Sequence, residues 1–350
     1  MISTPMHEDF TTLGEESEIY HVLHGKRVYI TGATGQIGWY LVHFLNFLIK
    51  AGKLQSQVTA HIRSNDKLTS KFPDEANLAC HFIVAEDATK ALEDADFDIV
   101  IHCASKASPK HFAATPVDVM LPNAILTHAL LEKIRQRNPK CQFIYLSTTG
   151  VTGFIPDEQR PAQESDYGPL SCTNLGNCYL ESKRFGEMIS LAYLHQYGIP
   201  IFIVRPSITY GPGFDLDDGR SYADFVHFLL LKKPIKLTSD GSAIRNFLYI
   251  SDFIRGLLLI LSKAPIGSVF NIASPNPINI LDLATQLNTS IYPEPLGPVE
   301  HQKVQQGLTR VDFKSTDATV DQLKTLGWNQ TVSPLEGFRR TIRHYQEFIR

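Results

Sequence analysis

Three evenly spaced glycines lie between an apolar run and a longer apolar-rich segment near the start of this chain. Residues 27–30 read as a short strand and residues 37–50 have helical apolar spacing, with Gly32, Gly35 and Gly38 at the junction. Glycine is needed where a strand turns tightly into a helix and where the backbone must approach a pyrophosphate, whose charge the helix amides then meet. The motif in this position predicts a dinucleotide-binding βαβ unit.

Strand and helix patterns alternate as far as Arg205. Apolar runs predict strands at 57–62, 80–85, 98–103, 142–146 and 200–204, and helical spacing predicts helices over 117–135 and 178–197. Such alternation implies right-handed βαβ units and a parallel sheet with both faces covered. We therefore expect an α/β fold, namely a Rossmann-type doubly wound parallel sheet with a smaller, mostly C-terminal lobe.

The composition of the sequence changes after Arg205, where Pro and Gly become more frequent and the predicted elements become shorter. We expect a loose leader over residues 1–24 and a sheet domain over 25–205, to which 245–272 return. The smaller lobe then comprises 206–244 and 273–350. No Pro/Ser-rich linker separates the two parts, so we expect them to pack tightly.

Composition limits the kinds of partner. The 33 Lys and Arg against 36 Asp and Glu give a net charge of −3, and no basic run exceeds a pair, which argues against a nucleic-acid-binding surface. The odd count of five Cys fits a reducing compartment, and neither a signal peptide nor a membrane-spanning stretch is evident. We expect a cytoplasmic protein without a membrane partner. His21 and His24 lack further nearby ligands, so we expect no metal site.

The end of the second predicted strand bears on the cofactor. An acid that binds the adenosine ribose is usual there, roughly 20 residues after the last glycine, but positions 58–64 contain no carboxylate. Arg63, with Ser64 and Lys67, offers charge-assisted hydrogen bonds to a ribose phosphate. The sequence favours NADP over NAD, and the alternative is that Arg63 is an ordinary solvated loop residue.

A phenol and an ammonium occur four residues apart on a predicted helix, as Tyr179 and Lys183. A phenol with an unperturbed pKa of about 10 is a poor base at neutral pH, so we expect the lysine and a nicotinamide charge to lower that pKa. Thr148 follows the strand at 142–146 and offers a hydroxyl to the same substrate oxygen. The order of glycine loop, strand end and helix makes this trio a candidate catalytic site.

From Lys26 onward, nearly the whole chain resembles the extended short-chain dehydrogenases/reductases of the NAD(P)-dependent epimerase/dehydratase family, which act on nucleotide sugars. The strings most similar to its UDP-glucuronate decarboxylase branch lie at 101–109, 176–184, 210–213, 218–220 and 245–252. This resemblance implies a nucleotide-sugar substrate. It also implies a homodimer in which the helices at 117–135 and 178–197 pair across a two-fold axis, and these helices carry more apolar surface than one sheet face needs.

The resemblance also assigns roles to individual residues. Thr148, Tyr179 and Lys183 are the implied catalytic residues, and Lys183 also holds the nicotinamide ribose. The implied cofactor-binding residues are Gly32, Thr34, Gly35, Gln36, Ile37, Gly38, Arg63, Asp87, Ala88, Ala104, Tyr179 and Lys183, with Asp87 against adenine and Ala104 along the cofactor. The implied substrate-binding residues are Lys106, Ser207, Arg220, Arg245 and Arg310, of which Arg245 matches a diphosphate-binding position. A guanidinium fork suits that geometry.

The chain departs from the family where acids are expected after the catalytic threonine. Dehydratases carry an acidic pair there and decarboxylases a Glu two residues on, whereas this chain has Thr149 and Gly150. We therefore expect an epimerase that works by oxidation and reduction at carbon 4 of the sugar. The alternatives are a 4-keto-sugar reductase, a dehydratase or decarboxylase, a reductase for an apolar substrate, and a dinucleotide-sensing protein without turnover.

Overall fold

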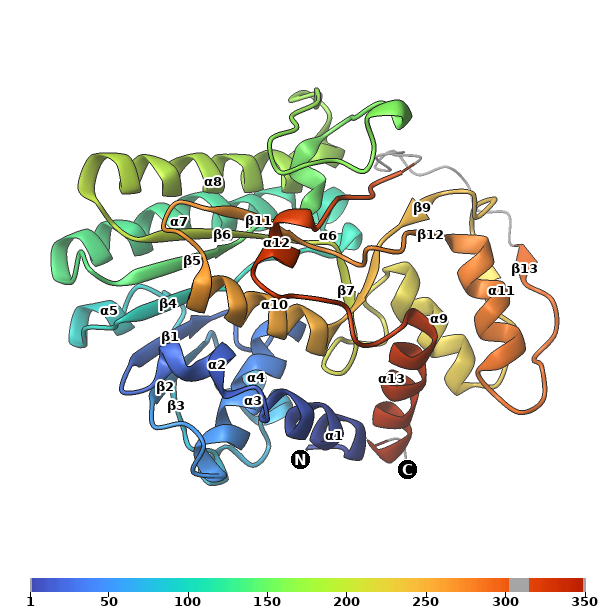
Figure 1. Ribbon diagram of the computed structural model, residues 1–350, viewed down its shortest axis with the longest axis horizontal. Coiled ribbons are helices and arrows are strands. Elements are labelled where there is room, and N and C mark those ends of the chain that lie inside the picture. Colours follow the sequence, from blue (N-terminus) through green and yellow to red (C-terminus); the bar gives the residue numbers. More distant parts are fainter. Residues whose placement is uncertain (1, 302–314, 349–350) are drawn as a thin grey trace.

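The computed structural model describes residues 2–301 and 315–348, and its centre is a seven-stranded sheet (Figure 1). The strand order is β11-β6-β5-β4-β1-β2-β3, and all neighbouring pairs are parallel. The strands are β1 (Arg27–Thr31), β2 (Gln57–Ile62), β3 (Cys80–Val84), β4 (Ile99–His102), β5 (Gln142–Leu146), β6 (Ile201–Pro206) and β11 (Val269–Ile272). This is the predicted Rossmann-type doubly wound fold, because the strand order reverses at β1.

Helices cover both faces of this sheet (Figure 1). On one face, α7 (Pro116–Arg137) and α8 (Cys178–Tyr197) pack against each other, with the short α5 (Ala91–Asp94) beside them. On the other face lie α3 (Gln36–Lys50) and α10 (Ile250–Lys263). The strands and long helices predicted from the sequence are confirmed to within two residues at each end.

The second lobe lies beyond the carboxyl ends of the strands, at the right of Figure 1. It contains the two-stranded pairs β7–β10, β9–β12 and β8–β13. Its elements are β7 (Ile208–Tyr210), β8 (Lys236–Leu237), β9 (Ile244–Arg245), β10 (Phe247–Tyr249), β12 (Ile278–Asn279), β13 (Glu300–His301), α9 (Ser221–Leu230), α11 (Ile280–Ser290), α12 (Asp321–Thr325) and α13 (Pro334–Phe348). Between them, α10 and β11 come back to the central sheet, where β11 pairs with β6.

The expectation of a loose leader over residues 1–24 is wrong. These residues form α1 (Thr4–Leu13) and α2 (Ser17–Tyr20), which pack against α10 and α13. Met6, Phe10 and Leu13 are buried because their spacing places them on one face of α1. The segment is thus part of the folded core.

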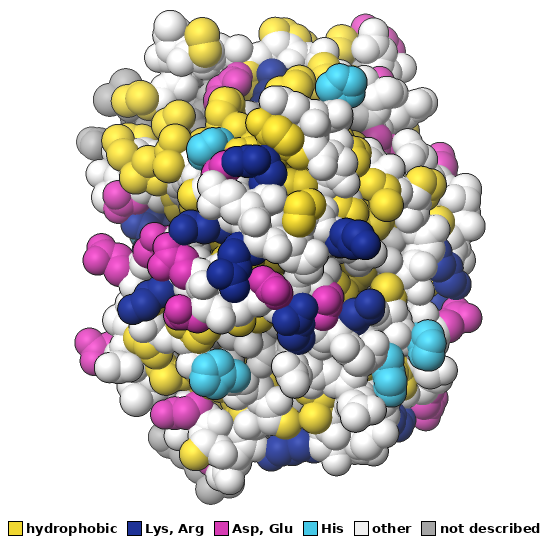
Figure 2. Space-filling model, turned by 90° about the vertical axis from the view of Figure 1, so that its left-hand side faces the viewer, with side chains coloured by type: hydrophobic (Ala, Val, Ile, Leu, Met, Phe, Trp, Pro, Cys, Tyr) yellow, Lys and Arg dark blue, Asp and Glu magenta, His cyan; other side chains and the backbone are white. Residues whose placement is uncertain are grey.

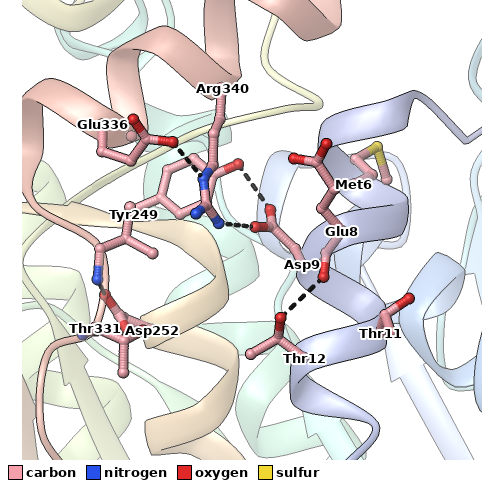
Figure 3. A network of polar contacts seen from close by, with 12 residues as sticks. Met6, Glu8, Asp9, Thr11, Thr12, Tyr249, Asp252, Thr331, Glu336 and Arg340 are labelled. Carbon is pink, nitrogen blue, oxygen red and sulfur yellow. Dashed lines mark hydrogen bonds and ion pairs between the residues drawn. The ribbon is translucent and has the colours of Figure 1, made fainter.

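Asp9 on α1 is the centre of a polar network that joins both ends of the described chain (Figure 3). Its Oδ2 accepts hydrogen bonds from the hydroxyls of Tyr40 and Tyr249, both at 2.8 Å. Its Oδ1 accepts one from Arg340 Nη1 at 2.6 Å, and Arg340 Nε donates to Glu336 at 3.0 Å. A buried carboxylate needs such partners, so the network fixes α1 against α3, β10 and α13.

Basic and acidic side chains are interspersed over the face shown in Figure 2, where neither sign forms a patch of its own. Ion pairs on the protein include Arg27–Asp98 at 3.3 Å and Lys133–Glu93 at 2.8 Å. All five cysteines are free. Within the described residues, no helix combines the length and apolar character needed to cross a membrane.

The turn from β1 into α3 shows why two of its glycines are required. Gly32 has φ +69°, and a Cβ there would stand 2.5 Å from the backbone nitrogen of Ala104. A Cβ at Gly38 would stand 2.5 Å from the carbonyl oxygen of Gly32. At Gly35, which begins α3 with φ −77°, the nearest atom would be 3.4 Å away. The fold therefore requires Gly32 and Gly38, whereas the packing tolerates a side chain at Gly35.

We predict that Gly32→Ala lowers the free energy of unfolding by about 3 kcal/mol, because it adds both a collision and a left-handed residue with a Cβ. Gly35→Ala, the matched control, should change it by less than about 1 kcal/mol, the scale of an N-cap substitution. Urea denaturation followed by circular dichroism measures both values. Equal losses in the two variants would contradict this account of the turn.

Candidate active site

Thr148, Tyr179 and Lys183 come together at the carboxyl end of β5. Lys183 is 2% exposed and its Nζ donates a hydrogen bond to the carbonyl of Leu146, the last residue of β5, at 2.5 Å. The same Nζ lies 5.9 Å from the centre of the half-buried Tyr179 ring. Thr148 lies close enough to Tyr179 for its hydroxyl to lower the pKa of the phenol. Since α8 starts at Cys178, both Tyr179 and Lys183 face the strand end from its first two turns.

The electrostatics of the pair differ from the expectation that Lys183 lowers the pKa of the phenol. Burial raises the pKa of Tyr179 to about 12, and the influences that lower it are the charge of Arg220 and the hydrogen bond from Thr148. Burial lowers the pKa of Lys183 to about 7. In the protein alone the phenol is therefore protonated at neutral pH, and proton transfer requires charge from bound ligands.

Phe112 is a residue of this site that sequence reasoning missed. It lies on α6 (Pro109–Ala114), and its ring stacks on that of Tyr179 with 5.2 Å between centres and 11° between planes. Cys178 Sγ donates to the carbonyl of Phe112 at 3.9 Å, which ties α6 to the start of α8. Phe112 thus covers one face of the phenol. An aromatic residue soon after β4 was the available signal, but no spacing rule pairs it with Tyr179.

Arg220 reaches the same place from the second lobe. Both oxygens of Asp218 accept hydrogen bonds from it, at 2.5 Å from Nε and 2.9 Å from Nη2. Its charge is one of the two influences that lower the pKa of Tyr179. The loop that carries Arg220 is also fastened to α6, because Ser108 Oγ donates to the carbonyl of Asp218. The reactive trio and a predicted substrate-binding arginine are thus neighbours.

The glycine loop fits a dinucleotide pyrophosphate. No side chain caps the amino end of α3, and the exposed Gly35 leaves open space there. Uncapped amides at a helix start suit a phosphate group. Thr34 and Ile37 are half-buried in this turn, and Gln36 Nε2 donates to the carbonyl of Gly211 at 3.1 Å, so its amide also ties the loop to the second lobe.

The other predicted cofactor residues follow β2, β3 and β4. Arg63 is exposed directly after β2. Asp87 is exposed and accepts hydrogen bonds from Thr89 N and Oγ1 at 2.8 and 2.9 Å. Ala88 is buried, and its carbonyl accepts the hydroxyl of Tyr29 at 2.6 Å. Ala104 packs against Gly32, where β1 and β4 end side by side.

The remaining predicted substrate residues are scattered more widely. Lys106 Nζ forms an ion pair with Asp118 at 2.7 Å. Arg245 is half-buried on β9 and donates from Nη1 to the carbonyl of Ile244 at 2.7 Å. Arg310 lies outside the described residues.

Hydroxyls without a protein partner mark the carboxyl edge of the sheet. Ser105, Ser147 and Ser207 follow the neighbouring strands β4, β5 and β6, and within the described structure each buried Oγ lacks a hydrogen bond. Buried polar atoms are nearly always paired in native proteins. Three such atoms at one sheet edge, where doubly wound folds bind ligands, support a binding site between the glycine loop and Tyr179.

Comparison with known proteins gives the family. The model of the NAD dependent epimerase/dehydratase family matches residues 28–273. UDP-glucuronic acid decarboxylase 6 of Arabidopsis thaliana is 28% identical over 315 residues, which cover 89% of this chain and 86% of that protein. UDP-glucuronic acid decarboxylase 2 of the same plant is 25% identical over 331 residues, covering 93% and 69%.

Solved structures agree with the fold. UDP-glucuronic acid 4-epimerase from Bacillus cereus, in complex with UDP-glucuronic acid and NAD, superposes with a TM-score of 0.74 at 25% identity, covering 92% of this chain and 99% of that one. UDP-N-acetylglucosamine 4-epimerase from Methanobrevibacter ruminantium M1 gives 0.78 at 20% identity, covering 93% and 100%. With the family model spanning most of the sheet and the reactive trio, this chain belongs to the NAD dependent epimerase/dehydratase family.

Proposed function

We propose that this protein is a nucleotide-sugar epimerase that acts by oxidation and reduction at carbon 4. The observation that carries the proposal is that the apolar side chain of Leu180 lies beside Gly150, two residues after Thr148. A Cβ at Gly150 would stand 2.8 Å from Cδ2 of Leu180, so the leucine occupies the space that an acidic side chain would enter. The hydride-transfer residues are retained while the acid that elimination or decarboxylation needs is missing.

The two nearest candidate substitutes for that acid have other partners. Both carboxylate oxygens of Asp218 are taken by Arg220. Glu181 lies one helical turn from Arg184, 3.9 Å from its guanidinium. A general base must reach the proton that it removes, and in this structure both carboxylates face arginines.

In this proposal each residue of the trio has one task. A nicotinamide held by the glycine loop and Lys183 would supply the acceptor and donor of the hydride at carbon 4, which would return to the opposite face of the sugar. Tyr179 takes the proton of the carbon-4 hydroxyl and gives it back, while Thr148 donates a hydrogen bond to the same oxygen. Lys183 would hold the nicotinamide ribose, and the positive charges of the nicotinamide and of Arg220 would favour the phenolate. The net change is an inverted carbon at constant mass.

The substrate is a nucleotide sugar held by arginines. Arg220 beside Tyr179 and Arg245 on β9 offer guanidinium groups suited to a diphosphate or a sugar carboxylate, and Lys106 and Ser207 border the same edge. UDP-glucuronic acid is the first compound to test, because its name recurs among the relatives and it is bound in the Bacillus cereus structure.

We predict a product of unchanged mass when the protein is incubated with UDP-glucuronic acid, UDP-glucose and their N-acetylated counterparts. Mass spectrometry measures the product, and proton NMR identifies the inverted centre. Tyr179→Phe keeps the ring that stacks on Phe112 but lacks the proton-transfer group, so its turnover should fall about 100-fold or more.

A product of any other mass would overturn the proposal of an epimerase. A product lighter by carbon dioxide or by water would restore the decarboxylase or dehydratase alternative. Two added hydrogens would instead identify a keto-sugar reductase. Full activity of Tyr179→Phe would remove the phenol from the mechanism.

We further propose that NADP is the preferred cofactor. The support is Arg63, which is exposed at the end of β2, where the sequence lacks the usual carboxylate. The hydroxyl of Ser64 accepts a hydrogen bond from Lys67 N at 3.4 Å and caps α4 (Asn65–Lys71), which leaves the side chains of Arg63 and Lys67 as the basic groups at this strand end. A guanidinium pairs well with a ribose phosphate.

At equal concentration, NADP should therefore raise the melting temperature more than NAD does, and Arg63→Ala should remove the difference. Thermal-shift measurements on both proteins test this, with Lys140→Ala, an exposed lysine before β5, as the control for loss of one charge. A larger response to NAD in the unsubstituted protein would reverse the preference.

We propose that two copies pair through α7 and α8. Val117, Leu121 and Ile125 form an exposed apolar row on α7, and Phe185 and Met188 are exposed on α8. Apolar side chains at helical spacing on adjacent helices fit a self-complementary two-fold contact.

Light scattering at micromolar concentration should give twice the mass of one chain, and Met188→Glu should reduce it to the mass of one. Leu231→Glu, at an exposed leucine that follows α9, is the matched control and should leave the dimer intact. A single-chain mass for the unsubstituted protein would contradict the proposal.

A further inference from the structure

Arg220 is a long side chain at the end of a loop that is rich in glycine. Gly211, Gly213 and Gly219 all adopt positive φ, and these three residues have no side chains that could anchor the loop. Asp218 pairs with Arg220 but belongs to the same loop, so the ion pair does not by itself fix the guanidinium relative to Tyr179. Ser108 holds the backbone of this loop against α6, and the guanidinium itself has a further contact beyond the loop.

Tyr222, in the first turn of α9, lies directly beneath the guanidinium. Arg220 Cζ is 4.9 Å from the centre of its ring, a distance at which the ring face attracts a cation. Tyr222 is fully buried, and its hydroxyl has no hydrogen-bond partner in the described structure. The contact between Arg220 and Tyr222 is therefore made by the face of the ring, because the hydroxyl makes no hydrogen bond.

Two further aromatic rings support Tyr222, one from the loop and one from α13. Phe214, within the loop, meets the Tyr222 ring edge to face at 4.9 Å. Tyr345 on α13 packs on Phe214 at 5.2 Å, and its hydroxyl donates to the carbonyl of Phe214 at 2.5 Å. The three rings form a column from α13 through the loop to α9.

We propose that Tyr222 is a positioning residue for Arg220. The face of its ring, held by Phe214 and Tyr345, keeps the guanidinium where it meets an anionic group of the nucleotide sugar next to Tyr179. This role rests on the proposed function, because it takes Arg220 to be a substrate-binding residue. The column is a specificity device of the second lobe and takes no part in cofactor binding.

Three variants and a control test the proposal. Tyr222→Leu removes the ring face and should raise the KM for the nucleotide sugar about tenfold, the scale of one desolvated cation–π contact, while kcat and the affinity for the dinucleotide stay within about threefold. Tyr222→Phe keeps the face and should have the unsubstituted KM. Tyr292→Leu is the matched control, because Lys232 Nζ lies 5.9 Å from that ring at the opposite end of α9. Arg220→Ala reports the role of the arginine itself.

Any of three results would overturn the inference. These are a normal KM in Tyr222→Leu, or a rise in KM in either Tyr222→Phe or Tyr292→Leu that equals the rise in Tyr222→Leu. Hydrogen exchange measured without substrate tests the support of the loop by Tyr222 separately from the proposed function. Amides of residues 214–220 should exchange faster in Tyr222→Leu but not in Tyr222→Phe, and unchanged exchange in both variants would refute the support by Tyr222. A normal KM in Arg220→Ala would count against the proposed substrate site instead.

Discussion

The buried ammonium of Lys183 is the constraint around which this site is arranged. A charged group that is 2% exposed requires partners, and the structure supplies the carbonyl of Leu146 and the face of the Tyr145 ring, 5.0 Å from Nζ. The hydroxyl of Tyr145 lies against Gly186, where a Cβ would stand only 2.0 Å away. Only a glycine at this position lets α8 approach β5 closely enough for the lysine to reach the strand end.

This arrangement also explains why the protein alone is not poised for proton transfer. Burial shifts the pKa of Lys183 down to about 7 and that of Tyr179 up to about 12, so desolvation disfavours the charged form of both. Arg220, which comes from the second lobe, and Thr148, which follows β5, counteract the shift in the phenol. Side chains from both parts of the protein therefore set the pKa of Tyr179.

Local patterns predicted most of the sheet domain, because each of its strands and long helices carries its own apolar period. They also grouped Thr148, Tyr179 and Lys183, whose order along the chain is informative. Contacts between distant segments were inaccessible, since nothing in the sequence joins Phe112 to Tyr179 or Tyr345 to Phe214. The apolar spacing in α1 was readable but was overlooked because polar residues surround it.

Fold and reaction are set by different residues in this chain. The family model covers the glycine turn and the candidate trio, whereas the proposed reaction depends on the side chains near Thr148, where Leu180 lies beside Gly150. Gly150 carries no side chain, and the sheet, the helices and the glycine turn form without an acid there. Activity within this family is therefore better inferred from the few side chains around Thr148 than from overall similarity.

The link between Asp9 and Arg340 has a consequence for how the protein is made. These residues are 331 positions apart, yet each satisfies the other's charge, and Met6 and Phe10 are buried on the same helix. During synthesis α1 leaves the ribosome before α13, which follows only after the whole sheet and most of the second lobe. Until then the apolar face of α1 lacks part of its cover, so α1 completes its packing only when α13 is available.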